Sequence, residues 1–131
     1  MSVLARYIEE VVEPTFNDFE ADPTPRRAFL AAVAIFHAVD RAGEDSGRKG
    51  SGNLRKNWGD RSAEFKIVDV VAHKFKHVRS NEEKQPRRLK DGTCQWGELT
   101  YGWVLSRMTM HEFTFVMRRA IGFIMEQSAT I

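Results

Sequence analysis

The chain has 131 residues, 42% of them hydrophobic and 29% charged, which excludes a disordered or fibrous protein and fits one soluble globular domain over residues 1–131. Its single cysteine, Cys94, excludes an intramolecular disulfide and favours a reducing, cytoplasmic location. The net charge is only +2, but residues 41–90 carry 14 basic and 7 acidic side chains, and this basic middle favours an anionic partner.

The first two predicted helices flank a proline-containing turn. Apolar residues at helical spacing predict a helix from about Val3 to Val12, which Pro14 then bends or ends. Thr24 is suited to cap a second helix, Pro25 to its first position and Gly43 to its end. Because apolar residues cover well over half of the surface of this second helix, we expect it to lie at the centre of the domain.

The segment from Glu44 to Asp60 predicts a long exposed loop. It contains four glycines together with basic and small polar residues, and only Leu54 and Trp58 offer apolar anchors. We therefore expect it to be the most mobile internal segment. A third helix then begins at Ser62 and is expected to run to about residue 77 or 79.

The last part of the chain predicts an irregular excursion followed by a helix. Asp91-Gly92 is a hairpin-turn dipeptide, and the aromatic residues that follow, up to Trp103, favour a small hairpin. Thr109 and Glu112 have the spacing of a capping box that begins a helix from Met110 to about Gln127. The expected fold is all-α: a four-helix up-and-down bundle with a small β-hairpin or irregular insertion before the last helix.

A polar stripe follows the third predicted helix. At 100° per residue one face collects Lys66, Asp69, His73, Lys76 and His77. One interpretation is the solvated face of an amphipathic helix. The other is a functional site.

The second predicted helix favours a site. His37 falls on the same row as Leu30, Val33 and Ala34, and Asp40 follows three residues later. Polar groups in apolar surroundings need partners. Asp40 is one candidate partner of His37, and if this row faces the third helix, the two residues share a pocket with the stripe.

These two elements resemble the motifs of a group of uncharacterised bacterial helical proteins, over about residues 25–80. That group has a His-x-x-Asp motif, matched by His37 and Asp40, and an Asp-x-x-Ala-Asn-x-x-Lys-His motif. The second motif is matched by Asp69, Ala72, Lys76 and His77, with His73 in place of asparagine. The group is in turn similar to the HEPN helical domains, many of which are metal-independent ribonucleases or partners in toxin systems.

The resemblance to HEPN domains implies RNA or a protein as the partner. The ribonucleases among them carry an arginine four to six residues ahead of a histidine, whereas only three residues separate Arg107 from His111 here. The enzymatic hallmark is therefore incomplete, and both an enzyme and a non-enzyme stay open.

Three hypotheses follow for the function. As a nuclease, the chain would use a histidine for acid–base catalysis and its basic loop for phosphate binding. The catalytic candidates are His37, Asp40, Asp69, Lys76 and His77, and the binding candidates are Arg48, Lys49, Arg55, Lys56 and Arg79. As a divalent-metal protein it would use nitrogen and oxygen ligands from His37, Asp40, Asp69, His73 and His77.

As a non-catalytic module, the chain would bind a partner protein or pair with itself as a homodimer. No motif indicates a cofactor. No apolar run is long enough to span a bilayer, so we expect no membrane partner.

Overall fold

The computed structural model describes residues 1–47, 52–76 and 109–130. The secondary-structure elements within these residues are all helices, which confirms the predicted all-α bundle. None of these helices is long and apolar enough to cross a membrane. The hairpin predicted at Asp91 to Trp103 lies outside the described residues.

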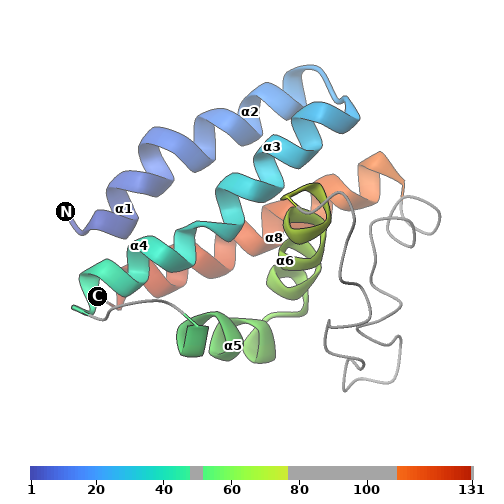
Figure 1. Cartoon of the computed structure of the whole chain (residues 1–131). Helices are drawn as coiled ribbons and strands as arrows, with labels where there is room; N and C mark the ends of the chain where they lie inside the picture. Colours follow the sequence, from blue (N-terminus) through green and yellow to red (C-terminus); the bar gives the residue numbers. More distant parts are fainter. Residues whose placement is uncertain (48–51, 77–108, 131) are drawn as a thin grey trace.

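The chain begins with one long helical rod. It consists of α1 (Val3–Tyr7), the π-helical turn η1 (Ile8–Val12) and α2 (Glu13–Ala21), which follow one another directly (Figure 1). Of the two outcomes predicted at Pro14, a bend or an end of the helix, the end is therefore wrong. In η1 the Glu13 N–H donates to the carbonyl of Ile8, five residues back. This wider turn leaves room for the ring of Pro14, which stands in the first turn of α2.

The second rod consists of α3 (Pro25–Phe36) and α4 (Ala38–Asp45). Thr24 caps it as predicted, because its Oγ1 accepts a hydrogen bond from the Arg27 N–H at 3.2 Å. The predicted end at Gly43 is wrong, since α4 continues to Asp45. The two helices are separated by His37 alone, which has φ −71° and ψ −4°.

Helix α5 (Gly52–Arg61) replaces most of the predicted loop. That prediction is wrong because Trp58 anchors the segment. The Trp58 side chain is buried, and its ring meets Phe65 and Phe123 edge-on with ring centroids 5.3 and 5.7 Å away. Burial of one indole stabilises a helix that local composition does not favour.

The last two helices begin where the sequence predicts. Ser62 caps α6 (Ala63–Lys76), its Oγ accepting from the Phe65 N–H at 3.0 Å. Thr109 and Glu112 form the predicted capping box of α8 (Met110–Ala129).

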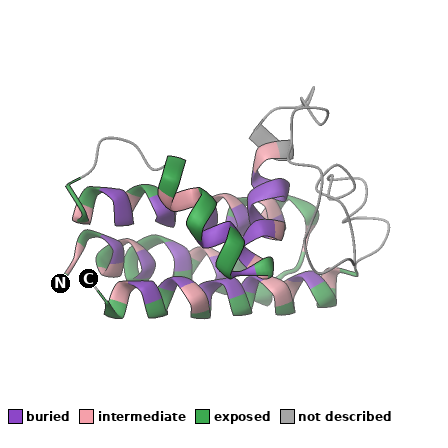
Figure 2. Cartoon of the chain, turned by 90° about the horizontal axis from the view of Figure 1, so that it is seen from below, coloured by how far each residue is buried: buried purple, intermediate pink, exposed green. Residues whose placement is uncertain are grey.

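Three long helical rods lie side by side: α1–η1–α2, α3–α4 and α8 (Figure 1). Helix α6 crosses them steeply, and α5 connects to its start. Each long helix turns a buried face inward and an exposed face outward (Figure 2). The largest fully buried side chains come from every rod and from α5 and α6: Leu4, Val12, Phe19, Ile35, Val39, Trp58, Phe65, Val68, Val71, Met117 and Ile124. Helix α3 is central, as predicted, since it packs against α2, α6 and α8.

Candidate functional site

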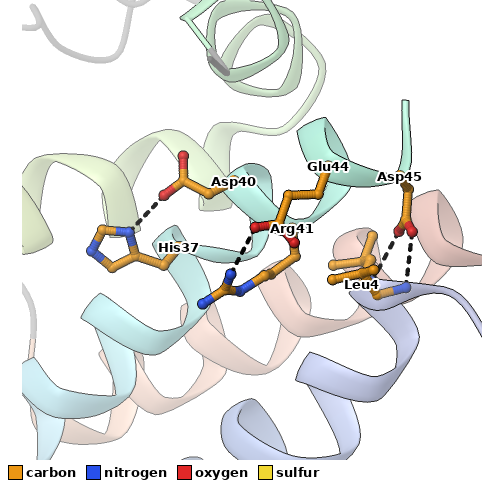
Figure 3. A network of polar contacts seen from close by, with 7 residues as sticks. Leu4, His37, Asp40, Arg41, Glu44 and Asp45 are labelled. Carbon is orange, nitrogen blue, oxygen red and sulfur yellow. Dashed lines mark hydrogen bonds and ion pairs between the residues drawn. The ribbon is translucent and has the colours of Figure 1, made fainter. Parts of the chain in front are cut away.

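His37 and Asp40 form a polar pair at the junction of α3 and α4 (Figure 3). The Nδ1 atom of His37 lies 2.8 Å from Oδ2 of Asp40, and the side chains are 39% and 48% exposed. The backbone break brings the two residues together, because the Asp40 N–H donates to the His37 carbonyl at 3.1 Å. Asp40, one of the candidate partners that the sequence offered, is therefore the hydrogen-bond partner of the His37 ring.

The geometry of this pair suits acid–base chemistry. With its proton on Nδ1, the imidazole donates to the carboxylate of Asp40 and presents Nε2 as an acceptor. Within the described part of the chain Asp40 is the one hydrogen-bond partner of the His37 ring, and Figure 3 shows the second ring nitrogen turned away from Asp40. A half-exposed histidine oriented by a carboxylate can take up and return a proton.

A second polar cluster joins α5 to α6. The Arg55 guanidinium donates to both oxygens of Asp69 at 2.8 Å each. Its Nη2 also lies 3.3 and 3.4 Å from the two ring nitrogens of His73. His73 Nδ1 is 3.1 Å from Asp69 Oδ1. The Asp69 carboxylate is thus surrounded by cationic and polar partners.

The polar stripe of the third predicted helix is therefore not a solvated face in its described part. Asp69 and Lys66 are buried and His73 is half-buried. Nζ of Lys66 lies 3.8 Å from the Asp60 carboxylate. The interpretation of the stripe as a solvated helix face is wrong here because α5 covers this side of α6.

Phe36 lies next to both polar groups. Its ring centroid is 5.1 Å from that of His37 and 5.6 Å from that of His73, each in an edge-on arrangement. The Arg55 guanidinium carbon lies 5.3 Å from the same ring centroid, in cation–π range. One phenylalanine ring therefore contacts a residue from each of the two predicted motifs.

The other predicted residues differ in their placement. Lys56 is exposed on α5, while Arg55, whose side chain is 36% exposed, donates from Nε and Nη2 to Asp69. Lys76 ends α6, and the remaining candidates lie outside the described residues: Arg48, Lys49, His77 and Arg79.

The metal alternative has no support in the residues that the structure describes. In them no three His, Cys, Asp or Glu side chains come close enough together to hold a metal ion. His77, which the sequence adds to this ligand set, is outside them.

Sequence reasoning missed Tyr7, which reaches the same helix junction from α1. Its hydroxyl donates to the Ala34 carbonyl at 2.7 Å, and the Arg41 guanidinium lies over its ring. Burial raises the pKa of Tyr7 to about 12; Arg41 lowers this pKa and Asp40 raises it. The only local signal was a tyrosine on the apolar face of the first helix.

No protein-family model, curated protein or solved structure matches this chain. Its function is therefore inferred from the geometry of these two polar groups. Of the two, the pair of His37 and Asp40 is the more exposed, and so the more accessible to a substrate.

Proposed function

We propose that this chain is a HEPN-like helical domain that binds RNA and cleaves it without a metal ion, using His37 as an acid–base group. The observation that carries the proposal is the 2.8 Å contact between His37 Nδ1 and Asp40 in a half-exposed pair. This contact orients the ring and leaves Nε2, on the other side of the ring, as the atom that accepts a proton.

The chemistry follows from the structure of RNA. The ribose 2′-hydroxyl attacks the adjacent phosphorus, the bond to the 5′-oxygen breaks, and a cyclic phosphate and a free 5′-hydroxyl result. His37 Nε2 takes the proton of the 2′-hydroxyl, and a second acid returns a proton to the 5′-oxygen. His77, the other histidine that the sequence motifs indicate, is our candidate for this second acid.

RNA binding is supported by the charge of the middle segment. Residues 41–90 carry a net charge of +7, and Lys56 on α5 is exposed. Lysine and arginine that neutralise phosphates release counterions, so binding must weaken as salt rises. Two of the three guanidinium nitrogens of Arg55 donate to Asp69, so we expect Arg55 to contribute less than Lys56.

The test uses the full chain, a labelled mixed RNA pool and EDTA in excess. We expect the wild type to cleave the pool, and His37→Ala to lose about 100-fold or more of the rate. Asp40→Asn should lose less, because the imidazole remains. Asp22→Asn is the matched control for Asp40→Asn, since the Asp22 carboxylate lies in an exposed ion pair with Arg27 and should keep full activity.

Three results would overturn the proposal. They are an inactive wild type, a His37→Ala variant with undiminished activity, and cleavage that EDTA abolishes and zinc restores. The last result would favour the metal alternative. Absence of both binding and cleavage would leave the non-catalytic partner or self-association module. Circular dichroism melting of each variant separates loss of chemistry from loss of fold.

A further inference from the structure

The helix break at His37 is stabilised by a contact from another rod. Carbonyl groups in the last turn of a helix have no partner within that helix. Ala34 stands in the last turn of α3, and its carbonyl accepts the Tyr7 hydroxyl at 2.7 Å. In an uninterrupted α-helix the N–H of Ala38 would donate to this same carbonyl. The tyrosine hydroxyl thus occupies an acceptor that a continuous helix would use.

Tyr7 is itself fixed in place. The Arg41 guanidinium carbon lies 5.3 Å from its ring centroid, and Arg41 in turn donates to Glu44 at 3.0 Å. Burial raises the pKa of Tyr7 to about 12. The hydroxyl therefore keeps its proton and remains a donor at neutral pH. It is thus protonated, and able to donate to the Ala34 carbonyl, under the conditions in which His37 would act.

We propose that Tyr7 is a positioning residue for the pair of His37 and Asp40, which rests on the function proposed above. By donating to the Ala34 carbonyl, its hydroxyl supplies a partner to the acceptor that the helix break exposes, and so stabilises the break that leaves His37 at ψ −4° instead of the helical value near −42°. That backbone angle sets where the imidazole stands relative to Asp40 on the next turn.

Removal of the hydroxyl has a defined consequence. In Tyr7→Phe the Ala34 carbonyl loses its donor, and the Ala38 N–H becomes the nearest replacement. One hydrogen bond is exchanged for another, so stability at neutral pH changes little while the orientation of His37 changes. A merely structural tyrosine would show the opposite: loss of stability with an unaltered histidine.

The ring tautomer of His37 is the readout, measured by long-range ¹H–¹⁵N correlation at a pH where the imidazole is neutral. In the wild type, the bond to Asp40 should fix the proton on Nδ1. We expect Tyr7→Phe to add a population with the proton on Nε2, as Asp40→Asn must do. The kcat for RNA should fall about 10- to 100-fold, with KM nearly unchanged.

Thr114→Val is the matched control. The Thr114 hydroxyl also donates to a helix carbonyl, that of Met110 at 2.8 Å, but on α8. Its removal should leave the His37 tautomer as in the wild type.

The outcomes separate this proposal from the proposed function. A wild type that cleaves no RNA refutes the function, whereas the tautomer still decides the role of Tyr7. An unchanged tautomer in Tyr7→Phe overturns the role of Tyr7 even if RNA is cleaved. Should Tyr7→Phe not fold, Arg41→Lys removes the planar group over the Tyr7 ring and keeps the charge. The same tautomer shift is expected there, and its absence refutes the proposal.

Discussion

Arg55 and Asp69 contact each other at two points, with Nε and Nη2 of the arginine each 2.8 Å from one oxygen of the carboxylate. The Asp69 side chain is 6% exposed and that of Arg55 is 36% exposed. The pair links α5 to α6. Helix α5, whose sequence alone does not favour a helix, is thereby bonded to a buried carboxylate. A buried carboxylate needs such a partner, because desolvation disfavours its charged form.

Substitution of Asp69 by Asn should destabilise the fold. Removing one partner of a buried ion pair costs about 3–5 kcal/mol, and we expect roughly 2 kcal/mol here because about a third of the Arg55 side chain is in water. Urea unfolding followed by circular dichroism measures the difference from the wild type.

Asp22→Asn is the control for that change. The Asp22 carboxylate pairs with Arg27 at 2.8 Å, and the two side chains are 66% and 43% exposed. We expect its loss to cost no more than about 0.5 kcal/mol. Equal losses in the two variants would show that the bidentate pair contributes nothing particular to stability.

Helix ends marked by local caps were predictable from the sequence. Ser62 and the box of Thr109 and Glu112 act within four residues, and each helix begins where its cap predicts. The segment before α6 was misjudged, because its helix depends on Trp58 packing on Phe65 and Phe123. Such packing depends on residues distant in sequence, which glycine content and charge do not reveal.

In the candidate site, too, contacts between residues close in sequence were predictable and contacts between distant residues were not. His37 and Asp40 are three positions apart at the junction of α3 and α4, so the sequence already offered Asp40 as a candidate partner of His37. The partner of Asp69 was not predicted, since Arg55 reaches it only when α5 is a helix. The contact of Tyr7 with Ala34 joins residues 27 apart and depends on how the first rod packs on α3.

The anchoring role of Trp58 can be measured directly. We expect Trp58→Ala to lose about 3–5 kcal/mol of unfolding free energy, because it leaves a cavity between α5, α6 and α8. The control is Phe115→Ala, since Phe115 is 58% exposed and its loss should change stability by about 0.5 kcal/mol or less. A Trp58→Ala protein as stable as the Phe115→Ala protein would mean that α5 forms without its anchor.

Asp45 is expected to stabilise the start of the first rod. Its two carboxylate oxygens accept from the N–H groups of Val3 and Leu4 at 2.8 and 2.9 Å (Figure 3). N–H groups at a helix start have no partner within the helix itself. Removal of a side chain that caps them costs about 1–2 kcal/mol. Asp45→Ala should lose that much and should speed amide exchange at both residues.

The neighbouring Glu44→Ala variant distinguishes a cap from a general effect of charge. Glu44 carries the same charge but pairs with Arg41, at the surface of α4. Its removal should leave amide exchange at Val3 and Leu4 unchanged. Faster exchange in both variants would argue that the negative charge alone, rather than the two hydrogen bonds, stabilises the helix start.

The raised pKa of Tyr7 predicts a loss of stability in alkali. The pKa is about 12 in the folded chain against an ordinary 10.0, because burial disfavours the phenolate and Asp40 adds to this, while Arg41 opposes it. The folded state therefore holds the proton more tightly than the unfolded state. The stabilisation is complete below pH 10 and is lost as the pH rises from 10 towards 12.

The full difference between these pKa values corresponds to roughly 2.7 kcal/mol, and we expect about half of it because water screens a half-buried ring. Urea unfolding of the wild type and of Tyr7→Phe between pH 9 and 12 isolates the contribution of this side chain, since every other titrating group is common to both. The wild type should lose about 1–1.5 kcal/mol more than the variant over this range. Parallel curves would show that the Tyr7 hydroxyl titrates alike in the folded and unfolded chains, contrary to a pKa raised by burial.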